Sequence, residues 1–237
     1  MAVLDLEVPP RAKGPRDHAP DRSPDRGGRP PVPPVRHDDR WGNGDGEPRP
    51  GFEGPPISNA RLGMLMLLGG ETMFFGGLVI AFLHLRLGAP VWPPPGQPRL
   101  PMGLTAVNTV VLLASSWAMV KALRAVRAGD GAGLARWLWR TWGLGVLFVL
   151  IQGVEWARLV QFGLRVSSGI YGATFYTLIG VHGAHVLGAV AWLTVILWLA
   201  RQGRFTRQGH VPLLCCAMYW HYVVALWPVL YLLVYLA

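Results

Sequence analysis

The sequence "IQGVEWARLVQFGLRVSSGIYGATFYTLIGVHGAHVLGAVAW" (151–192) contains two apolar segments, 151–159 and 171–192, and both carry ionisable side chains where a membrane helix should have none. Gln152 and Glu155 are three residues apart and share one helical face, and His182 and His185 repeat that spacing one segment later. Ionisable groups at membrane depth are costly and usually mark a functional site or a seam between helices. We therefore expect these four side chains to lie close to whatever the protein does.

The composition indicates a membrane protein. The chain has 237 residues, of which 51% are hydrophobic, and its mean hydropathy is +0.32, which is too apolar for an average soluble domain. Several apolar runs approach the roughly 20 residues that a bilayer-spanning helix requires. They cover 62–86, 103–126, 141–163, 172–200 and 211–236. The sequence therefore predicts an all-α fold, a polytopic transmembrane bundle of five spans.

Basic residues predict how the spans are oriented. One set of connections carries most of them: Arg61, Lys121, Arg124, Arg127, Arg136, Arg140, Arg201, Arg204 and Arg207. The opposite connections carry fewer, namely Arg86, Arg99, Arg158 and Arg165. Because Lys and Arg are enriched in cytoplasmic loops, we expect a cytoplasmic N-terminus and an external C-terminus.

The net charge of +9 and the pI near 10.4 raise the question of nucleic-acid binding. No basic helix or aromatic platform stands apart from the membrane pattern, so we expect no nucleic-acid partner. The cysteines, Cys215 and Cys216, are adjacent in an apolar run, which excludes a disulfide framework.

Residues 1–57 differ in composition from the rest of the chain. They are rich in Pro, Gly, Arg and Asp and nearly lack large apolar side chains. Such a segment cannot bury enough surface to offset the entropy lost on ordering. We therefore expect a disordered cytoplasmic tail over 1–57, or alternatively an extended arm that binds a neighbouring subunit, followed by a five-helix domain over 58–237.

Five ionisable residues fall inside the predicted spans: Glu71, Glu155, His182, His185 and His221. Carboxylates and imidazoles are common metal ligands, so an autonomous haem or metal protein using the three histidines is one interpretation. Against it, the Glu-x-x-His pairs typical of di-iron bundles are missing from the sequence. The simpler interpretation is that each side chain holds two helices together.

Glu71 also admits a role in proton transfer. At about 1.5 Å per residue it lies near the middle of the first span, where a carboxyl group can carry a proton. A proton-coupled carrier built on Glu71 is therefore a third interpretation. The spans show no inverted or parallel repeat, which is the usual basis of alternating access.

A series of distinct motifs follows in order along residues 58–237. They are "LGMLMLLGGETMFF" (62–75), Trp92-Pro93-Pro94 with Asn108-Thr109 and Ser115-Ser116, then Gln152, Glu155 and Trp156, then Tyr171-Gly172 with Gly180, His182, Gly183, His185, Val186 and Gly188, and finally Tyr219 to Val223. In this order and spacing the chain resembles subunit III of the haem–copper oxidases, the family of cytochrome c and quinol oxidases.

The resemblance implies a subunit of a proton-pumping oxidase complex in a bacterial plasma (inner) membrane. Such a subunit lies beside subunits I and II, which hold haem and copper, and is not itself expected to carry a cofactor or the catalytic centre. Members of the family bind phospholipids in a cleft between helix groups and support proton uptake and turnover. The chain looks like the five-span form, whose N-terminus is cytoplasmic. The electron donor, cytochrome c or a quinol, stays open, as does a nitric-oxide-linked role.

Two positions depart from the family pattern. The family usually has Asp soon after its Trp-His motif and often Glu shortly before it, whereas this chain has Val224 and Leu214. Both changes remove polar groups from the fifth span, which puts proton chemistry there in doubt.

The resemblance also assigns roles to single residues. We expect Glu71 to pair with His182 or His185, and Gln152 and Glu155 to anchor the third span to the fourth through His185. Asn108 and His221 complete the polar network between helices. At the basic end of the fourth span, Arg201 and Arg204 are candidates for holding lipid phosphates.

Overall fold

Five long helices make up most of the described chain. The computed structural model describes residues 58–96 and 102–236. The helices are α1 (Asn59–Leu87), α2 (Met102–Ala128), α3 (Gly131–Gln161), α4 (Ile170–Arg201) and α5 (Val211–Tyr231), and a π-helical turn, η1 (Leu232–Leu236), follows α5. The predicted tail over 1–57 and Arg99 lie outside the described residues.

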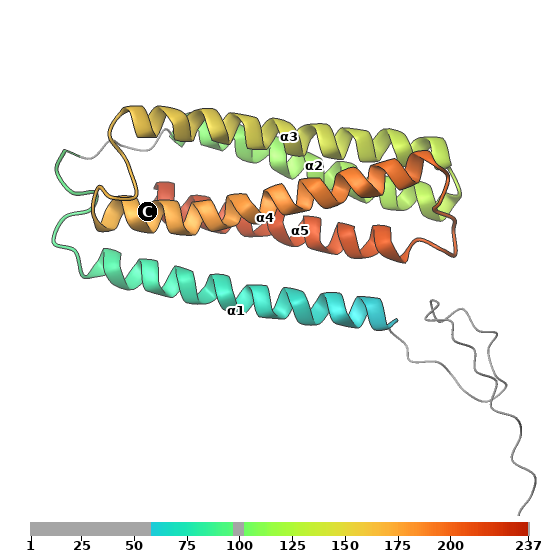
Figure 1. Cartoon of the computed structure of the whole chain (residues 1–237), viewed down its shortest axis with the longest axis horizontal. Coiled ribbons are helices and arrows are strands. Elements are labelled where there is room, and N and C mark those ends of the chain that lie inside the picture. Colours follow the sequence, from blue (N-terminus) through green and yellow to red (C-terminus); the bar gives the residue numbers. More distant parts are fainter. Residues whose placement is uncertain (1–57, 97–101, 237) are drawn as a thin grey trace, which may run out of the picture. The chain divides into compact units, whose positions relative to one another are not determined.

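The predicted fold class is confirmed. Each of the five helices in the described ranges is long and apolar enough to cross a membrane, and these ranges contain no strand. The helices run up and down in succession (Figure 1). The helix bounds differ from the predicted spans mainly at the ends, because hydropathy marks the apolar part of a helix and not its polar termini.

The connection between the second and third spans is much shorter than predicted. The spans predicted at 103–126 and 141–163 left a basic connection over 127–140, but α2 continues to Ala128 and α3 begins at Gly131. Gly129 makes the turn with a positive φ of 78°, and the Asp130 carboxylate caps α3 by accepting from the Gly133 N–H at 2.7 Å. The arginines of this region therefore lie on helix ends, where long side chains can reach the membrane surface.

The helices α2, α3, α4 and α5 pack around a common core, while α1 packs against α4 and α5 (Figure 1). Large side chains at the centre of the core are fully buried, among them Met119, Leu138, Phe175, Trp220 and Trp227. The Trp220 side chain of α5 packs directly on Gly145 of α3, where a Cβ would overlap the indole ring. Small residues at helix contacts are the usual means of close packing in membranes.

Polar side chains tie α2 to its neighbours. The Trp220 and Trp227 indole N–H groups of α5 donate to the hydroxyl oxygens of Ser115 (3.2 Å) and Thr109 (2.9 Å) on α2. The Asn108 amide donates to the Phe148 carbonyl of α3 at 3.1 Å. Since lipid tails offer no hydrogen-bond partners, such bonds between helices satisfy groups that would otherwise be left unpaired.

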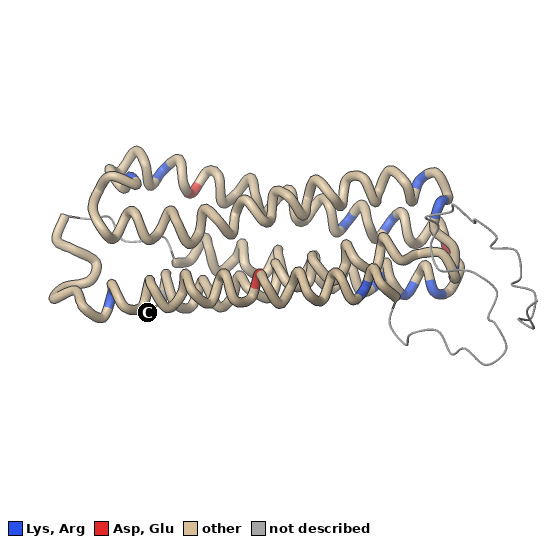
Figure 2. The backbone as a smooth tube through the Cα atoms, turned by 60° about the horizontal axis from the view of Figure 1, so that its bottom comes forward, with Lys and Arg blue, Asp and Glu red and all other residues tan. Residues whose placement is uncertain are grey.

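Most basic residues lie at one end of the bundle, which we call the basic end (Figure 2). It contains the start of α1, the α2–α3 turn and the connection after α4. Tryptophans from α2 and α3 lie against these cations: Arg140 stands 4.5 Å from the Trp137 ring centroid and Lys121 stands 5.0 Å from that of Trp117. Aromatic residues and cations in this arrangement are typical of a membrane interface.

Candidate functional site

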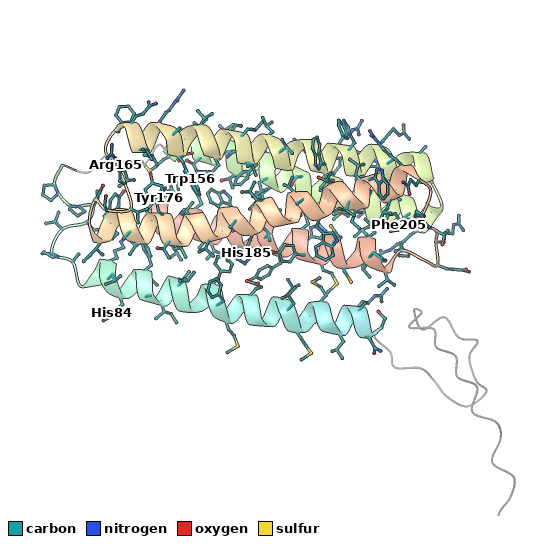
Figure 3. The ribbon with its side chains drawn as sticks, viewed as in Figure 1. His84, Trp156, Arg165, Tyr176, His185 and Phe205 are labelled. Carbon is teal, nitrogen blue, oxygen red and sulfur yellow. The ribbon has the colours of Figure 1, made fainter. Side chains whose placement is uncertain are left out.

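Glu71 and His185 are in contact near the middle of their helices, which is one of the two pairings predicted for Glu71. The Glu71 Oε2 and His185 Nε2 atoms are 3.1 Å apart, which joins α1 to α4, and each side chain is 20% exposed. Glu71 lies about 18 Å along α1 at 1.5 Å per residue. Phe75 packs edge-on against the imidazole, with ring centroids 5.1 Å apart. Figure 3 shows His185 between its own helix and α1.

The hydrogen bonds of His185 define how this pair holds a proton. Its Nδ1 lies 2.7 Å from the Val181 carbonyl oxygen, and because a carbonyl can only accept, Nδ1 must carry a hydrogen. The contact between Nε2 and Glu71 then needs one further proton, which either the imidazole donates to a carboxylate or the carboxylic acid donates to the imidazole. The pair therefore holds one proton between two groups that can exchange it.

An open hollow exposes this pair to the surface of the described helices. It has a volume of about 580 Å³ and is lined by Met66, Leu67, Gly70, Glu71, Phe74 and His185. Apart from the pair itself, the lining is apolar. The side chains of Glu71 and His185 thus meet an environment suited to lipid tails or to an apolar helix of another subunit.

The predicted contact between Glu155 and His185 is wrong. Both oxygens of the Glu155 carboxyl lie 2.9 Å from the Thr105 hydroxyl of α2, and the side chains of Gln152 and Tyr235 also hydrogen-bond to this carboxyl. Glu155 is 1% exposed. The reason is direction: His185 Nε2 bonds to Glu71 of α1 and its Nδ1 to the Val181 carbonyl of α4, whereas Glu155 points toward α2 and η1.

Gln152 and Glu155 nevertheless belong to one buried polar cluster, which we call the Glu155 cluster: Thr105, Gln152, Glu155 and Tyr235. The Gln152 amide donates to the Tyr235 hydroxyl at 3.3 Å. Glu155 is six residues from the end of α3, or about 9 Å at 1.5 Å per residue, so the cluster lies near the end opposite the basic end. It links α2, α3 and the turn after α5.

His182 and His221 take separate positions. The His182 ring stacks on Trp227 with centroids 5.2 Å apart, it is 1% exposed, and neither ring nitrogen has a hydrogen-bond partner in the described part of the chain. The His221 Nδ1 atom lies 2.6 Å from the Ser116 hydroxyl. Neither imidazole joins the Glu71–His185 hydrogen bond, although the Phe75 ring packs edge-on against His182 as well, with centroids 6.4 Å apart.

The donor set does not fit a metal centre. Within residues 58–96 and 102–236, no three side chains of His, Cys, Asp or Glu come together as metal ligands. His185 uses both ring nitrogens in hydrogen bonds, and His221 faces a serine. In these residues His182, His185 and His221 therefore do not converge on a shared three-ligand metal site.

Arg201 and Arg204 lie at the basic end, as predicted, but on a different side of α4 from the Glu71 hollow. The Arg201 guanidinium stands 5.1 Å from the Trp139 ring centroid of α3. Arg201 follows His185 by 16 residues, which at about 100° per residue turns it roughly 160° around the helix. A lipid phosphate at Arg201 would therefore lie along the α3–α4 side.

Sequence reasoning missed two residues of the Glu155 cluster, Thr105 and Tyr235. Thr105 precedes Asn108 by three residues, so it lies on the same buried face of α2. The spacing argument used for Gln152 and Glu155 would have found it. Tyr235 gave no such signal, since it stands four residues after the end of α5 in an apolar sequence.

The departures in the fifth span fit the packing. Val224 is buried and Leu214 is half-buried. Trp220 and Trp227 supply hydrogen bonds from α5 instead. The structure thus attaches this helix through indole N–H groups and apolar contacts.

Comparisons with known proteins agree with these motifs. A family model described as cytochrome c oxidase subunit III matches residues 56–237. Cytochrome c oxidase subunit 3 of Synechocystis sp. is 37% identical over 175 residues, 73% of this chain and 74% of that protein. A probable cytochrome c oxidase subunit 3 of Nocardia farcinica is 34% identical over 174 residues (73% and 86%), and the subunit 3 of Bos taurus is 35% identical over 182 residues (74% and 68%).

The match extends over the whole described helical region and not over a single motif. The similar proteins come from bacteria and a mammal, and all are described as subunit 3 of cytochrome c oxidase. The chain therefore belongs to the cytochrome c oxidase subunit III family and is a membrane-spanning subunit of a haem–copper oxidase of the respiratory chain.

Proposed function

We propose that this chain is a non-redox accessory subunit that stabilises the catalytic subunit, binds phospholipid and supports proton uptake during oxygen reduction. Its partners are oxidase subunits I and II, which hold the haem and copper, in a bacterial plasma membrane with the N-terminus cytoplasmic. The observation that carries the proposal is the Glu71–His185 pair, an ionisable contact at mid-helix whose side chains are both partly exposed.

The pair supports a proton-linked role because of its hydrogen bonds. One proton lies between Glu71 and His185, and the hollow gives that proton a side from which it can be exchanged. A buried carboxyl without such an exit, such as Glu155, serves structure instead. The pair can therefore hold a proton close to a partner subunit without taking part in electron transfer.

Lipid binding is supported at the basic end. The Arg201 guanidinium lies over the Trp139 ring, and its N–H groups can bind a phosphate. Arg204 stands three residues after the end of α4 and is exposed. A phospholipid held there would run its chains along α3 and α4, because a phosphate marks the membrane surface and the chains extend inward.

The proton role is tested in the purified complex with Glu71→Gln. We expect unchanged haem content, slower proton uptake and faster loss of activity during turnover. Thr72→Ala is the matched control, since the Thr72 hydroxyl donates to the Leu68 carbonyl of its own helix at 2.8 Å. Proton uptake and turnover lifetime equal to those of the Thr72→Ala complex would refute the proton role.

The lipid and non-redox assignments need separate measurements. Native mass spectra of the complex should show less bound phospholipid for Arg201→Ala than for Arg158→Ala, which removes a charge at the opposite end of α3. Equal lipid in both variants would refute the lipid site. Haem or copper that stays with the isolated chain after the other subunits are removed would refute the non-redox assignment.

A further inference from the structure

A cleft opens between α3 and α4 on the side of α4 away from the Glu71 hollow. Its volume is about 270 Å³. Its rim is exposed and its floor is buried: Gly153, Ala184 and Leu187 form the rim, and Phe148, His182 and Trp227 lie on the floor. Because the rim faces outward at membrane depth and is apolar, an occupant enters from the hydrocarbon phase or from a neighbouring subunit.

Unpaired polar atoms are concentrated around this cleft. In the part of the chain that the structure describes, six buried side-chain nitrogen or oxygen atoms have no hydrogen-bond partner, and four of them belong to its lining. They are both ring nitrogens of His182, Oε1 of Gln152 and Nε1 of Trp156. A buried polar group without a partner costs about 1 to 3 kcal/mol, so this concentration indicates that a partner is supplied by an occupant.

The unpaired atoms define the chemistry of that occupant. The Trp156 N–H is a donor, Gln152 Oε1 is an acceptor, and a neutral His182 offers one of each. Carbonyl and hydroxyl oxygens satisfy such a set. An occupant from the membrane therefore needs one or two such oxygens on an otherwise apolar body.

The walls favour a flat ring. His182 and Trp227 are stacked, with an interplanar angle of 22°, and Phe148 packs edge-on against Trp227 with centroids 5.2 Å apart. Trp156 lies between α3 and α4 beside Tyr176 (Figure 3). Mostly aromatic walls with a few polar groups are typical of sites for small ring-shaped ligands.

A phospholipid chain from the basic end fits this position poorly. Leu187 precedes Arg201 by 14 residues, or about 21 Å along the helix, whereas one leaflet of the hydrocarbon core is only about 15 Å thick.

The Trp156 ring is the element that can admit an occupant. It is half-buried and rests on the glycine face of α4, where a Cβ at Gly183 would lie 3.2 Å from the ring. Glycine presents no side chain that locks the indole. The unpaired atoms are buried, so an occupant's oxygens reach them only when this indole turns.

We propose that the α3–α4 cleft binds a membrane-soluble ring compound with carbonyl or hydroxyl oxygens, the chemistry of quinones and quinols. His182, Gln152 and Trp156 bind the ring oxygens, and Phe148 and Trp227 flank the ring. The cleft opens on another side of α4 from the Glu71–His185 pair, although the Phe75 ring packs on both imidazoles, and its test does not depend on the proton and lipid roles.

Photoaffinity labelling of the intact purified complex tests this. The probe is an azido-quinone with a short alkyl tail, and the labelled peptides of this chain are mapped by mass spectrometry. We expect label on the peptides that contain 148–156 and 179–187, displaced by excess decylubiquinone. Gly153→Leu fills the mouth of the cleft, and we expect about tenfold less label, equivalent to 1.4 kcal/mol.

Gly188→Leu is the matched control, because a Cβ at Gly188, as at Gly153, meets nothing within 4 Å, yet Gly188 does not line the cleft. Equal labelling of both variants would overturn the proposal. So would labelling of the same peptides by a phospholipid with a photoreactive acyl chain that decylubiquinone fails to displace.

A second variant covers the case in which Gly153→Leu does not assemble. Trp156→Phe keeps an aromatic ring and removes the N–H donor. Loss of one hydrogen bond should weaken displacement by decylubiquinone about fivefold, with haem content unchanged. Displacement at the same quinone concentration as in the parent complex would exclude a role for Trp156 in binding.

Discussion

α1 and α5 are both apolar helices of the same chain, but the structure holds them in very different ways. Three of the 29 residues of α1 are buried, compared with nine of the 21 residues of α5. A Cβ added at any of five α1 glycines, Gly63, Gly69, Gly70, Gly76 and Gly77, meets nothing within 4 Å. The α5 helix instead donates two indole hydrogen bonds to α2. Two helices that are both apolar therefore occupy different positions, one in the core and one at the periphery.

The two carboxylates inside the helices show the same contrast. Glu155 is 1% exposed and accepts hydrogen bonds in the core, whereas Glu71 is 20% exposed and pairs with an imidazole at the edge of the bundle. A group buried in the core contributes to stability, and a group that remains accessible can exchange protons. The comparison therefore separates residues that maintain the fold from residues available for function.

The largest expected effect comes from Glu155→Ala. The change removes the acceptor for Thr105 and Tyr235 and leaves a void, so we expect a loss of about 3 kcal/mol in unfolding free energy. Glu155→Gln keeps an acceptor oxygen at similar volume and should lose less than half as much. Detergent-titrated unfolding of the complex measures both. A Glu155→Ala complex as stable as the parent would show that the cluster does not hold α2 to α3.

Gly145→Ala should come next. The new Cβ would overlap the Trp220 ring, and displacing this buried indole should cost about 2 kcal/mol. Gly143→Ala is the control on the same helix, since a Cβ there meets nothing within 4 Å. That variant should be neutral or slightly stabilising, by up to about 1 kcal/mol, because alanine favours a helix. Equal melting temperatures of the two complexes would contradict the packing argument.

Trp227→Phe tests the link from α5 to α2. The indole N–H donates to Thr109 at 2.9 Å, and phenylalanine keeps the ring contact with His182 while losing this donor. We expect a loss of about 1 kcal/mol in unfolding free energy. Thr109→Val removes the other partner, and the double variant should lose little more than either single one. Strictly additive losses would mean that this bond adds no stability.

Glu71→Gln should have the smallest effect on stability. The side chain is partly exposed and bonded to one partner, and pairs of this kind contribute about 0.5 kcal/mol or less. The same variant should nevertheless slow proton uptake, whereas Glu155→Gln should not. A stability loss for Glu71→Gln as large as that for Glu155→Ala would remove the distinction between the two carboxylates.

The partners of His182 and His185 show why the site was harder to predict than the fold. Residues three apart differ by about 60° around a helix, so they share a broad face but need not meet the same neighbour. His185 reaches α1, and His182 lies on the α3–α4 cleft and stacks on Trp227 of α5. The spacing identified both histidines as unusual, but it could not decide which one pairs with Glu71.

Hydropathy, helix length and the order of the motifs are properties of the sequence alone, and they determined the five-span all-α fold and the family. They suffice because the need to satisfy the backbone inside a bilayer is local to each segment. The pairing of Glu71 with His185, that of Glu155 with Thr105 and the α3–α4 cleft depended on the tertiary structure. Each joins residues from different helices, and the rotation and proximity of packed helices depend on side-chain contacts that no single segment contains.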